Sequence, residues 1–376
     1  MRLLIYGDIG GSGGFVRHCK GLLGTGAIPS DMDIYFVCST QFYEKLGRLD
    51  DGVRVITHHW PASRTRLKRY LWHLWAYPRL VRRLRPDVEF FPSGQLRVYL
   101  RKSVAVTMCR NLLPFDRAEL EHYRGTPEYE LFLRYRRNHA ASFRRSAGVI
   151  FVSRHSREVV TSQVSGIRMS TVVPHGLDEA FRIQESRSYD IGSVVTVLYV
   201  SYLYHYKHGP ELVRAVGLTR NQTGLNVRLR LVGGVSTSAA GPLERAIRQE
   251  NAGGHVELIG PLDTKALLPE YRNADIFVFA SSCECFPNTL LEAMGARLPI
   301  ASSDRVGLPD ILRDAGVYFD PESPESIAGT LTSLATNEEK RRICGQKAYE
   351  RSIDFTWKRC AEETFAFLRR VWEDSQ

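Results

Sequence analysis

The chain has 376 residues, a length at which two domains of ordinary size are expected, and its 43% hydrophobic and 24% charged residues exclude a disordered chain or a collagen-like repeat. No stretch supplies the roughly 20 consecutive apolar residues of a membrane-spanning helix, and the short apolar run after Arg2 does not have the form of a signal peptide. The net charge of +10 is unevenly spread along the chain, and surfaces rich in basic residues attract phosphate in some form.

The first half of the chain alternates short apolar runs with helical stretches. The run that ends at Tyr6 leads into a glycine-rich turn (GDIGGSGG, residues 7–14) and then into a helix over residues 15–22. Further strands are predicted at residues 34–38, 53–57, 88–91, 104–108 and 148–152. Strands that alternate with helical crossovers predict a parallel sheet covered by helices on both faces. We expect this domain to comprise residues 1–182.

The glycine-rich turn is compatible with a dinucleotide bound through its pyrophosphate. The acidic residue expected after the second strand is missing, however, because the run at 34–38 ends in Ser39 and Thr40. A nicotinamide-dependent enzyme therefore remains an alternative. The same glycines suit a tight turn that leaves room for a ligand held by the other domain.

Two features before residue 60 imitate metal sites. Asp31-Met-Asp33 has the form of a metal-binding D-x-D motif, but it precedes a predicted strand and is expected to form a turn. His58 and His59 follow the third strand, where histidines more often lie in the core or at a cleft edge. We predict no metal at either place.

A strongly basic segment lies between Pro61 and Pro86. It contains no acid, and Trp72, Trp75 and Tyr77 lie among its eight cations, which are Arg64, Arg66, Lys68, Arg69, Arg79, Arg82, Arg83 and Arg85. A second basic cluster comprises Arg134, Arg136, Arg137, Arg144 and Arg145. A solvated helix face, an anionic membrane surface and a nucleic acid all fit this charge, although no nucleic-acid-binding motif accompanies it.

The alternation pauses near residues 180–192 and then resumes. Strands are predicted at residues 194–200, 227–232, 255–259, 276–279, 299–301 and 316–319. They predict a second Rossmann-like domain, over residues 190–350, which faces the first. A helix capped by Thr356 closes the chain, and we expect residues 356–374 to pack back on the first domain.

The strongest functional signal is the segment ASSCECFPNTLLEAM at residues 280–294. Pro287 suits the start of a helix from Asn288 toward Gly295, because its missing N–H costs nothing there. The free N–H groups of Asn288 and Thr289, together with the positive end of the helix dipole, point to an anion. Glu284 precedes this anion site and Glu292 lies one turn inside the helix. A pair of acids at this spacing also occurs by chance, so the segment alone leaves the function open.

These residues resemble a known family. Glu284-x7-Glu292 is similar to the E-x7-E signature of the retaining GT-B glycosyltransferases of family 4, of the type that assembles bacterial surface polysaccharides. Collinear similarities cover essentially the whole chain: RNLLPFD at 110–116, VVPHGLD at 172–178 with Phe181, YVSYLYHYKHG at 199–209, YFDP at 318–321 and the closing helix with Trp357. They are most specific over residues 172–320.

The resemblance implies a role for each matching residue. Glu284 would bind hydroxyls of the donor sugar, Glu292 the nucleotide ribose, and Lys207 the diphosphate, with help from the N–H groups of Asn288 and Thr289. Other implied contacts are Gly13 and Gly14 near the phosphate, Pro261 and Leu262 as walls for the base, and Arg110 and Asn111 toward the acceptor and the sugar. The family implies retention by front-face attack, so no nucleophile is assigned, and no metal or other cofactor is expected.

The chain departs from the family at one phosphate contact. Many members carry an arginine five residues before the phosphate lysine, where this chain has Tyr202. Compensation of the diphosphate would then need Lys207 together with His208, or Arg17 from the first domain.

Taken together, these residues predict an enzyme that moves a hexose or deoxyhexose from a nucleotide-diphosphate sugar, GDP- or UDP-linked, to a glycan or lipid-linked acceptor. The alternatives are an NAD-dependent Rossmann enzyme and a basic nucleic-acid-binding protein. The seven cysteines are few and odd in number, which predicts reduced thiols in a cytoplasmic protein, and Cys283 and Cys285 lack the second pair that a zinc site requires. The basic segment with its tryptophans predicts peripheral attachment to an anionic inner membrane.

Overall fold

The computed structural model describes residues 1–7, 13–58, 71–96, 103–185, 187–305 and 307–376. Contacts divide the chain into two units. The N-terminal unit comprises Met1–Gly176 and Thr356–Gln376, and the C-terminal unit comprises Leu177–Phe355. The contacts thus place residues 177–182, which the sequence interpretation assigned to the first domain, in the C-terminal unit.

The N-terminal unit is built on a parallel sheet of seven strands in the order β3-β2-β1-β4-β5-β6-β7. The strands are β1 Arg2–Tyr6, β2 Asp33–Ser39, β3 Val53–His58, β4 Val88–Phe91, β5 Val104–Cys109, β6 Gly148–Phe151 and β7 Met169–Val172. The helices are α1 Gly13–Leu23, α2 Thr40–Leu46, η1 Trp72–Ala76, α4 Tyr77–Leu84, η2 Leu113–Phe115, α5 Arg117–Glu121, α6 Pro127–Arg145, α7 Arg154–Thr161 and α15 Trp357–Glu373.

The C-terminal unit repeats this plan with six parallel strands in the order β10-β9-β8-β11-β12-β13. The strands are β8 Val195–Val200, β9 Val227–Val232, β10 Val256–Gly260, β11 Ile276–Phe279, β12 Ile300–Ser303 and β13 Gly316–Phe319. The helices are η3 Glu179–Phe181, η4 His205–Lys207, α8 Gly209–Thr223, α9 Thr237–Gln249, η5 Ala252–Gly254, α10 Thr264–Asn273, α11 Asn288–Gly295, α12 Leu308–Leu312, η6 Arg313–Ala315, α13 Pro324–Ala335 and α14 Glu338–Ser352.

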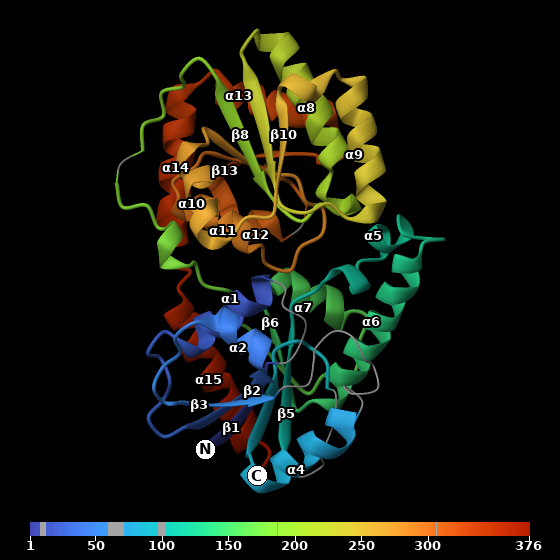
Figure 1. The fold of residues 1–376 in the computed structure, drawn as a ribbon, viewed down its shortest axis with the longest axis vertical. Helices are drawn as coiled ribbons and strands as arrows, with labels where there is room; N and C mark the ends of the chain where they lie inside the picture. The colour runs from blue at the N-terminus through green and yellow to red at the C-terminus, as the bar shows by residue number, and fades with distance from the viewer. Residues whose placement is uncertain (8–12, 59–70, 97–102, 186, 306) are drawn as a thin grey trace. The chain divides into compact units, whose positions relative to one another are not determined.

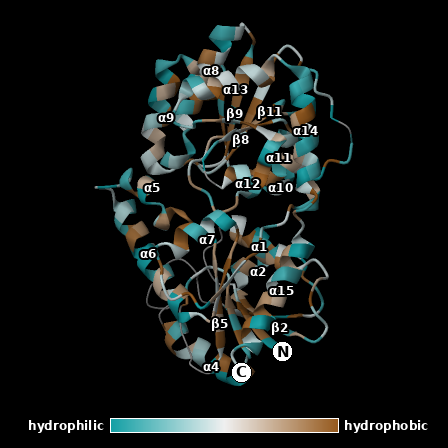
Figure 2. Ribbon diagram, turned by 180° about the vertical axis from the view of Figure 1, so that it is seen from behind, coloured by the Kyte–Doolittle hydropathy of each residue, from teal (hydrophilic) through white to brown (hydrophobic). Residues whose placement is uncertain are grey.

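The short apolar runs form strands because both faces of each sheet are covered. Every residue of β4, β6 and β11 is buried, as expected for strands that lie between two helical layers. Figure 1 shows helices along both sides of the strands in each unit, and Figure 2 shows that apolar residues follow the strands. The prediction of two Rossmann-like α/β domains is confirmed.

The last helix belongs to the N-terminal unit. Thr356 caps α15 by accepting a hydrogen bond from the Arg359 N–H at 3.1 Å, and α15 packs beside α1. The indole ring of Trp357 lies over Gly21 of α1, where a Cβ atom would come within 2.1 Å of the ring. A glycine is therefore required at that contact.

The order of the strands marks one ligand-binding edge in each unit. The chain first builds one side of each sheet and then the other, so the order reverses between β1 and β4 and between β8 and β11. In doubly wound sheets, ligands bind outside the carboxyl ends of the strands at this reversal. The loops that follow β8 and β11 are the corresponding loops of the C-terminal unit. Across the described residues, no helix is both long and apolar enough to span a bilayer.

Candidate active site

Two loops meet where the strand order of the C-terminal unit reverses. Lys207 ends η4 in the loop after β8, Glu284 lies in the loop after β11, and the Lys207 ammonium forms an ion pair with the Glu284 carboxylate. The two side chains are only 10% and 18% exposed. The ammonium also lies 4.9 Å from the centroid of the Tyr206 ring and 5.6 Å from that of Phe279. A largely desolvated cation thus faces an acid and two aromatic rings, which strengthens both kinds of contact.

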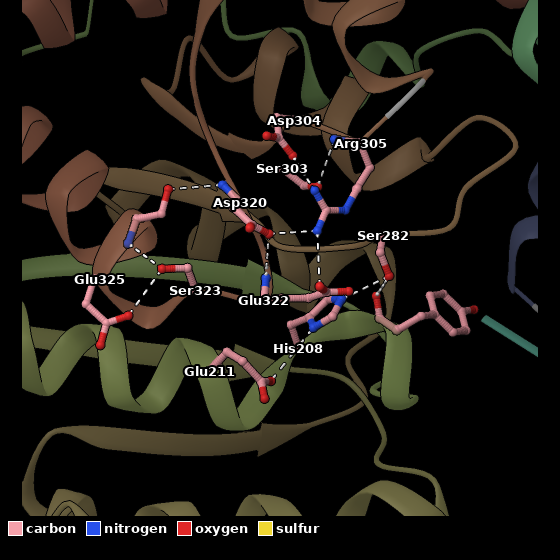
Figure 3. A network of polar contacts seen from close by, with 12 residues as sticks. His208, Glu211, Ser282, Ser303, Asp304, Arg305, Asp320, Glu322, Ser323 and Glu325 are labelled. Carbon is pink, nitrogen blue, oxygen red and sulfur yellow. Dashed lines mark hydrogen bonds and ion pairs between the residues drawn. The ribbon is translucent and has the colours of Figure 1, made fainter. Parts of the chain in front are cut away.

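Hydrogen bonds between the two loops fix the position of this pair. Ser282 donates its backbone N–H to the Tyr206 carbonyl at 2.9 Å, and its hydroxyl lies 2.9 Å from His208 Nε2. Figure 3 shows His208 between Ser282 and Glu211, whose carboxylate lies 3.8 Å from His208 Nδ1. His208 has a left-handed backbone with φ 51°, which is uncommon for a residue other than glycine. The strained residue directly after Lys207 sets the turn from η4 into α8.

Helix α11 presents its N-terminus in the same loop as Glu284. Pro287 occupies the N-cap and has no side-chain acceptor, so the first N–H groups of the helix, at Asn288 and Thr289, lack an intrahelical partner. Asn288 Oδ1 is buried and has no hydrogen-bond partner within the described part of the chain. Free N–H groups and the positive end of the helix dipole favour an anion here, as the sequence predicts.

Glu292 lies in the second turn of α11 and is only 2% exposed. The hydroxyl of Tyr271, from α10, donates to Glu292 Oε2 at 2.8 Å and also lies 3.2 Å from the Thr289 carbonyl. Tyr271 therefore orients the buried carboxylate. The sequence did not single out Tyr271, because its only signal is an aromatic residue at helical spacing, which is typical of a core position.

The loops after β8, β9 and β10 form an adjoining surface. Gly233 donates its N–H to the Gly260 carbonyl at 2.9 Å, and Pro261 and Leu262 follow directly, the first exposed and the second half-buried. The ring of Tyr202, which is 52% exposed, covers Gly234, where a Cβ atom would come within 2.6 Å of it. Tyr202 thus presents an aromatic face where the family resemblance implies a cation, and Pro261 and Leu262 follow β10 at the same edge of the sheet.

Arg305 is held by acids in the loops after β12 and β13. Its guanidinium lies 3.0 Å from Asp304, 2.7 Å from Asp320 and 3.4 Å from Glu322 (Figure 3). Because three carboxylates compensate its charge, we do not assign Arg305 to the diphosphate. Lys207 remains our candidate for that role.

In the N-terminal unit, Arg110 follows β5 and donates to the Gly14 carbonyl at 2.7 Å. Its guanidinium also lies 5.3 Å from the centroid of the Phe15 ring, while Asn111 is exposed. Gly13 and Gly14 begin α1, so these four residues gather at the carboxyl edge of the sheet. Residues 8–12 of the glycine-rich turn lie outside the described residues, as do His59, Arg64, Arg66, Lys68 and Arg69.

Ser39, Asp31 and Asp33 bear on the dinucleotide site and the D-x-D metal site considered above, and all three make other contacts in the structure. Ser39, where a dinucleotide-binding fold would place an acid, caps α2 by accepting from the Phe42 N–H at 3.3 Å. Asp31 lies 2.6 Å from Arg369, and Asp33 lies 3.5 Å from Arg54 at the start of β2. The D-x-D aspartates are thus paired with arginines at a strand entrance.

Solved structures share this architecture over nearly the whole chain. The sucrose-phosphate synthase tll1590 from Thermosynechococcus elongatus superimposes with a TM-score of 0.76 at 18% identity, covering 100% of both chains. HepE from Anabaena in complex with UDP-glucose superimposes with a TM-score of 0.74 at 16% identity, covering 98% of this chain and 100% of that one. The fold is that of the GT-B glycosyltransferases.

The GT-B assignment agrees with sequence similarity in the C-terminal unit. Residues 183–351 match the family model of glycosyl transferases group 1, and Lys207, Glu284 and Glu292 all lie within that match. The O-antigen chain mannosyltransferase B of Escherichia coli is 27% identical over 122 residues, which are 32% of this chain and 31% of that protein. The D-inositol 3-phosphate glycosyltransferase of Corynebacterium efficiens is 28% identical over 172 residues, 44% and 41% of the two chains. The chain spans less than half the length of these curated relatives.

Proposed function

We propose that the chain is a retaining glycosyltransferase that takes a hexose or deoxyhexose from a nucleotide-diphosphate sugar and transfers it to a glycan or lipid-linked glycan. The observation that carries the proposal is the Lys207–Glu284 ion pair beside the N-terminus of α11, one turn before the buried Glu292. The group 1 match and the UDP-glucose complex of HepE favour a nucleotide sugar as the donor, GDP- or UDP-linked.

The charges of the site suit departure of a diphosphate. When the bond between the anomeric carbon and the phosphate oxygen breaks, its electron pair stays on that oxygen. The Lys207 ammonium and the N–H groups of Asn288 and Thr289 would stabilise the negative charge that develops there. A donor sugar also brings hydroxyl groups, which can donate to Glu284 once the diphosphate has taken its place beside Lys207.

The configuration of the anomeric carbon is retained if the acceptor attacks from the same face of the sugar as the one from which the diphosphate departs. The acceptor oxygen then bonds to the anomeric carbon, and its proton passes to the departing phosphate oxygen, so no protein nucleophile is required. Lys207 and the helix N-terminus supply the charge compensation that other glycosyltransferases obtain from a metal ion. We therefore propose that the reaction is independent of metal.

Nuclear magnetic resonance of the product tests both statements. With an α-linked nucleotide sugar, we expect an α-linked product and full activity in the presence of EDTA. A β-linked product would refute retention, and loss of activity restored by Mg²⁺ or Mn²⁺ would refute metal independence. A thermal-shift screen across GDP-, UDP- and dTDP-linked sugars identifies the donor first, because a ligand that binds the folded chain raises its unfolding midpoint.

For the acceptor, we propose a growing surface polysaccharide such as lipopolysaccharide, O-antigen or capsule. The similarity to an O-antigen chain mannosyltransferase supports this choice, while the relative named for D-inositol 3-phosphate shows that the group serves other acceptors. A lipid-linked acceptor would place the enzyme at the cytoplasmic face of the inner membrane. Incubation with the identified donor and lipid-linked oligosaccharides, followed by mass spectrometry, should show one added hexose. Transfer to inositol phosphate alone would refute the acceptor.

A further inference from the structure

A basic hollow lies at the amino edge of the sheet in the N-terminal unit. Its volume is about 1220 Å³, and its lining includes Asp87, Val104, Ala147 and Arg168, each at or directly before the start of one of the neighbouring strands β4, β5, β6 and β7. Because all four strands are parallel, the hollow extends along their amino ends.

This position separates the hollow from the residues predicted to act in transfer. Arg110 follows the carboxyl end of β5, whereas Val104 begins the same strand. Six residues of extended chain, at about 3.3 Å each, put roughly 20 Å between the two edges. A ligand in the hollow therefore does not touch Arg110, Gly13 or Gly14, and its binding would be separate from the transfer site.

The charge of the hollow suits phosphate. Arg82 and Arg85 come from α4 and the residue after it, Arg145 ends α6, and Arg168 precedes β7. Among the described residues that line it, Asp87 carries the one acidic side chain, and its Oδ2 accepts the Arg2 backbone N–H at 2.7 Å. Each guanidinium group can donate two parallel hydrogen bonds to the oxygens of one phosphate. Four guanidinium groups around one hollow therefore suit a phosphodiester.

A second observation identifies the source of the phosphate. Leu71, Trp75, Arg79 and Arg82 follow one another at helical spacing across η1 and α4, and we call them the α4 stripe. Leu71 is 38% and Trp75 56% exposed, and the Arg79 guanidinium lies 5.2 Å from the centroid of the Trp75 ring. Exposed tryptophan and leucine beside arginine are typical of segments that lie in the interface of an anionic bilayer. The α4 stripe leads to the hollow through Arg82, which belongs to both.

We infer that the hollow binds the phosphate headgroup of an anionic lipid while the α4 stripe inserts beside it. The inference rests on the membrane attachment within the proposed function and adds the surface and the lipid group that produce it. It does not depend on which sugar is transferred, since none of its residues belongs to the candidate active site.

Vesicle binding by the full chain tests this site. The probes are phosphatidylcholine vesicles with and without phosphatidylglycerol. We expect binding only with phosphatidylglycerol, and about thirtyfold weaker binding for the double variant Arg145→Gln/Arg168→Gln, from the usual contribution of a basic residue near an anionic surface. Trp75→Ala should weaken binding as well. The matched control is Arg134→Gln/Arg137→Gln, which removes the same charge from exposed positions of α6 outside the hollow and should bind nearly as the unaltered chain does.

Two outcomes of the binding experiment would overturn the inference. Equal losses in the two double variants would show that only net charge matters. Binding of glycerol phosphate in solution without binding to vesicles would make the occupant a soluble phosphate. Circular dichroism and unfolding midpoints confirm that the variants fold. Transfer to a soluble acceptor, measured on the same samples, separates the two proposals: vesicle binding through the hollow by a chain without transfer would refute the proposed function alone.

Discussion

The Lys207 ammonium and the Glu284 carboxylate form an ion pair although 77 positions separate them in the chain. They meet because β8 and β11 are neighbours in the sheet, so the loops after the two strands open at the same edge. In the proposed reaction, a donor would bring an anion for Lys207 and hydroxyl groups for Glu284. Its binding would then exchange one ion pair for two new contacts, and the two partners can be tested separately.

Substitution of either partner should abolish most of the transfer, but with opposite effects on nucleotide binding. Lys207→Met removes the cation beside the leaving group, so we expect a fall of about 10²–10³-fold in kcat together with weaker binding of the nucleoside diphosphate. Glu284→Gln should lower kcat by a similar factor and leave nucleoside diphosphate affinity unchanged or higher, because the carboxylate no longer competes for Lys207. Titration calorimetry with UDP and GDP measures the affinities.

The control for these two variants is Lys347→Ala, which removes an exposed lysine paired with Asp314 in the same unit. It should keep full activity. A Glu284→Gln variant that transfers sugar at the unaltered rate would remove that residue from the site.

Tyr271→Phe tests the support of Glu292, the acid that we propose binds the ribose. The change deletes the hydroxyl that donates to Glu292 and leaves the ring in place, so the buried carboxylate loses a donor, at a cost of about 1–3 kcal/mol. We expect weaker binding of the nucleoside diphosphate. In a Glu292→Gln background the same change should cost less, because the two groups act as a unit. Additive losses in the double variant would show that Tyr271 acts elsewhere.

Much of this architecture could be predicted, because buried parallel strands are visible in the sequence as short apolar runs. Strand β9 and helix α11 have the predicted bounds, Val227–Val232 and Asn288–Gly295, and β8 begins one residue later than expected. Strand β7, Met169–Val172, was not predicted, since Ser170 and Thr171 break the apolar pattern and its residues are only half-buried at the edge of the sheet.

The candidate site was less accessible to sequence reasoning. The resemblance named Lys207, Glu284 and Glu292 separately, and their roles stay predictions. The ion pair between two of them and the hydrogen bond from Tyr271 to the third depend on strand order and on the contact of the Tyr271 side chain with α11, which no local pattern encodes. The positive charge of the basic segment is visible in the sequence. The hollow is not, because Arg85, Arg145 and Arg168 belong to three distant segments that only the folded sheet brings together.

Acid should destabilise the N-terminal unit. Burial, and then the positive charge of Arg110, lower the pKa values of His18 and His175 well below 6.5. Below that pH the unfolded chain binds more protons than the folded unit, so the free energy of unfolding falls as pH decreases, by up to about 2.7 kcal/mol per pH unit for two histidines. Denaturant unfolding followed by tryptophan fluorescence from about pH 7.5 down to about pH 5.5 measures the slope. His18→Gln should remove about half of it, and an unchanged slope in that variant would assign the pH dependence to other groups.

The return of α15 to the N-terminal unit can be tested at a single glycine. Gly176 lies against the start of α15, where a Cβ atom would come within 2.1 Å of Trp357 N and 2.5 Å of the Thr356 carbonyl carbon. Backbone atoms cannot move aside as a flexible side chain can, so Gly176→Ala should destabilise the unit by about 3 kcal/mol or more and lower its unfolding midpoint by roughly 6–12 °C. Gly329→Ala is the control, because Gly329 lies within α13 with open space around its Cβ position. That change should raise stability by about 0.5–1 kcal/mol, since alanine favours a helix over glycine. If Gly176→Ala unfolded at the unaltered temperature, residues 176 and 357 would not lie together, and α15 would not close the N-terminal unit at that point.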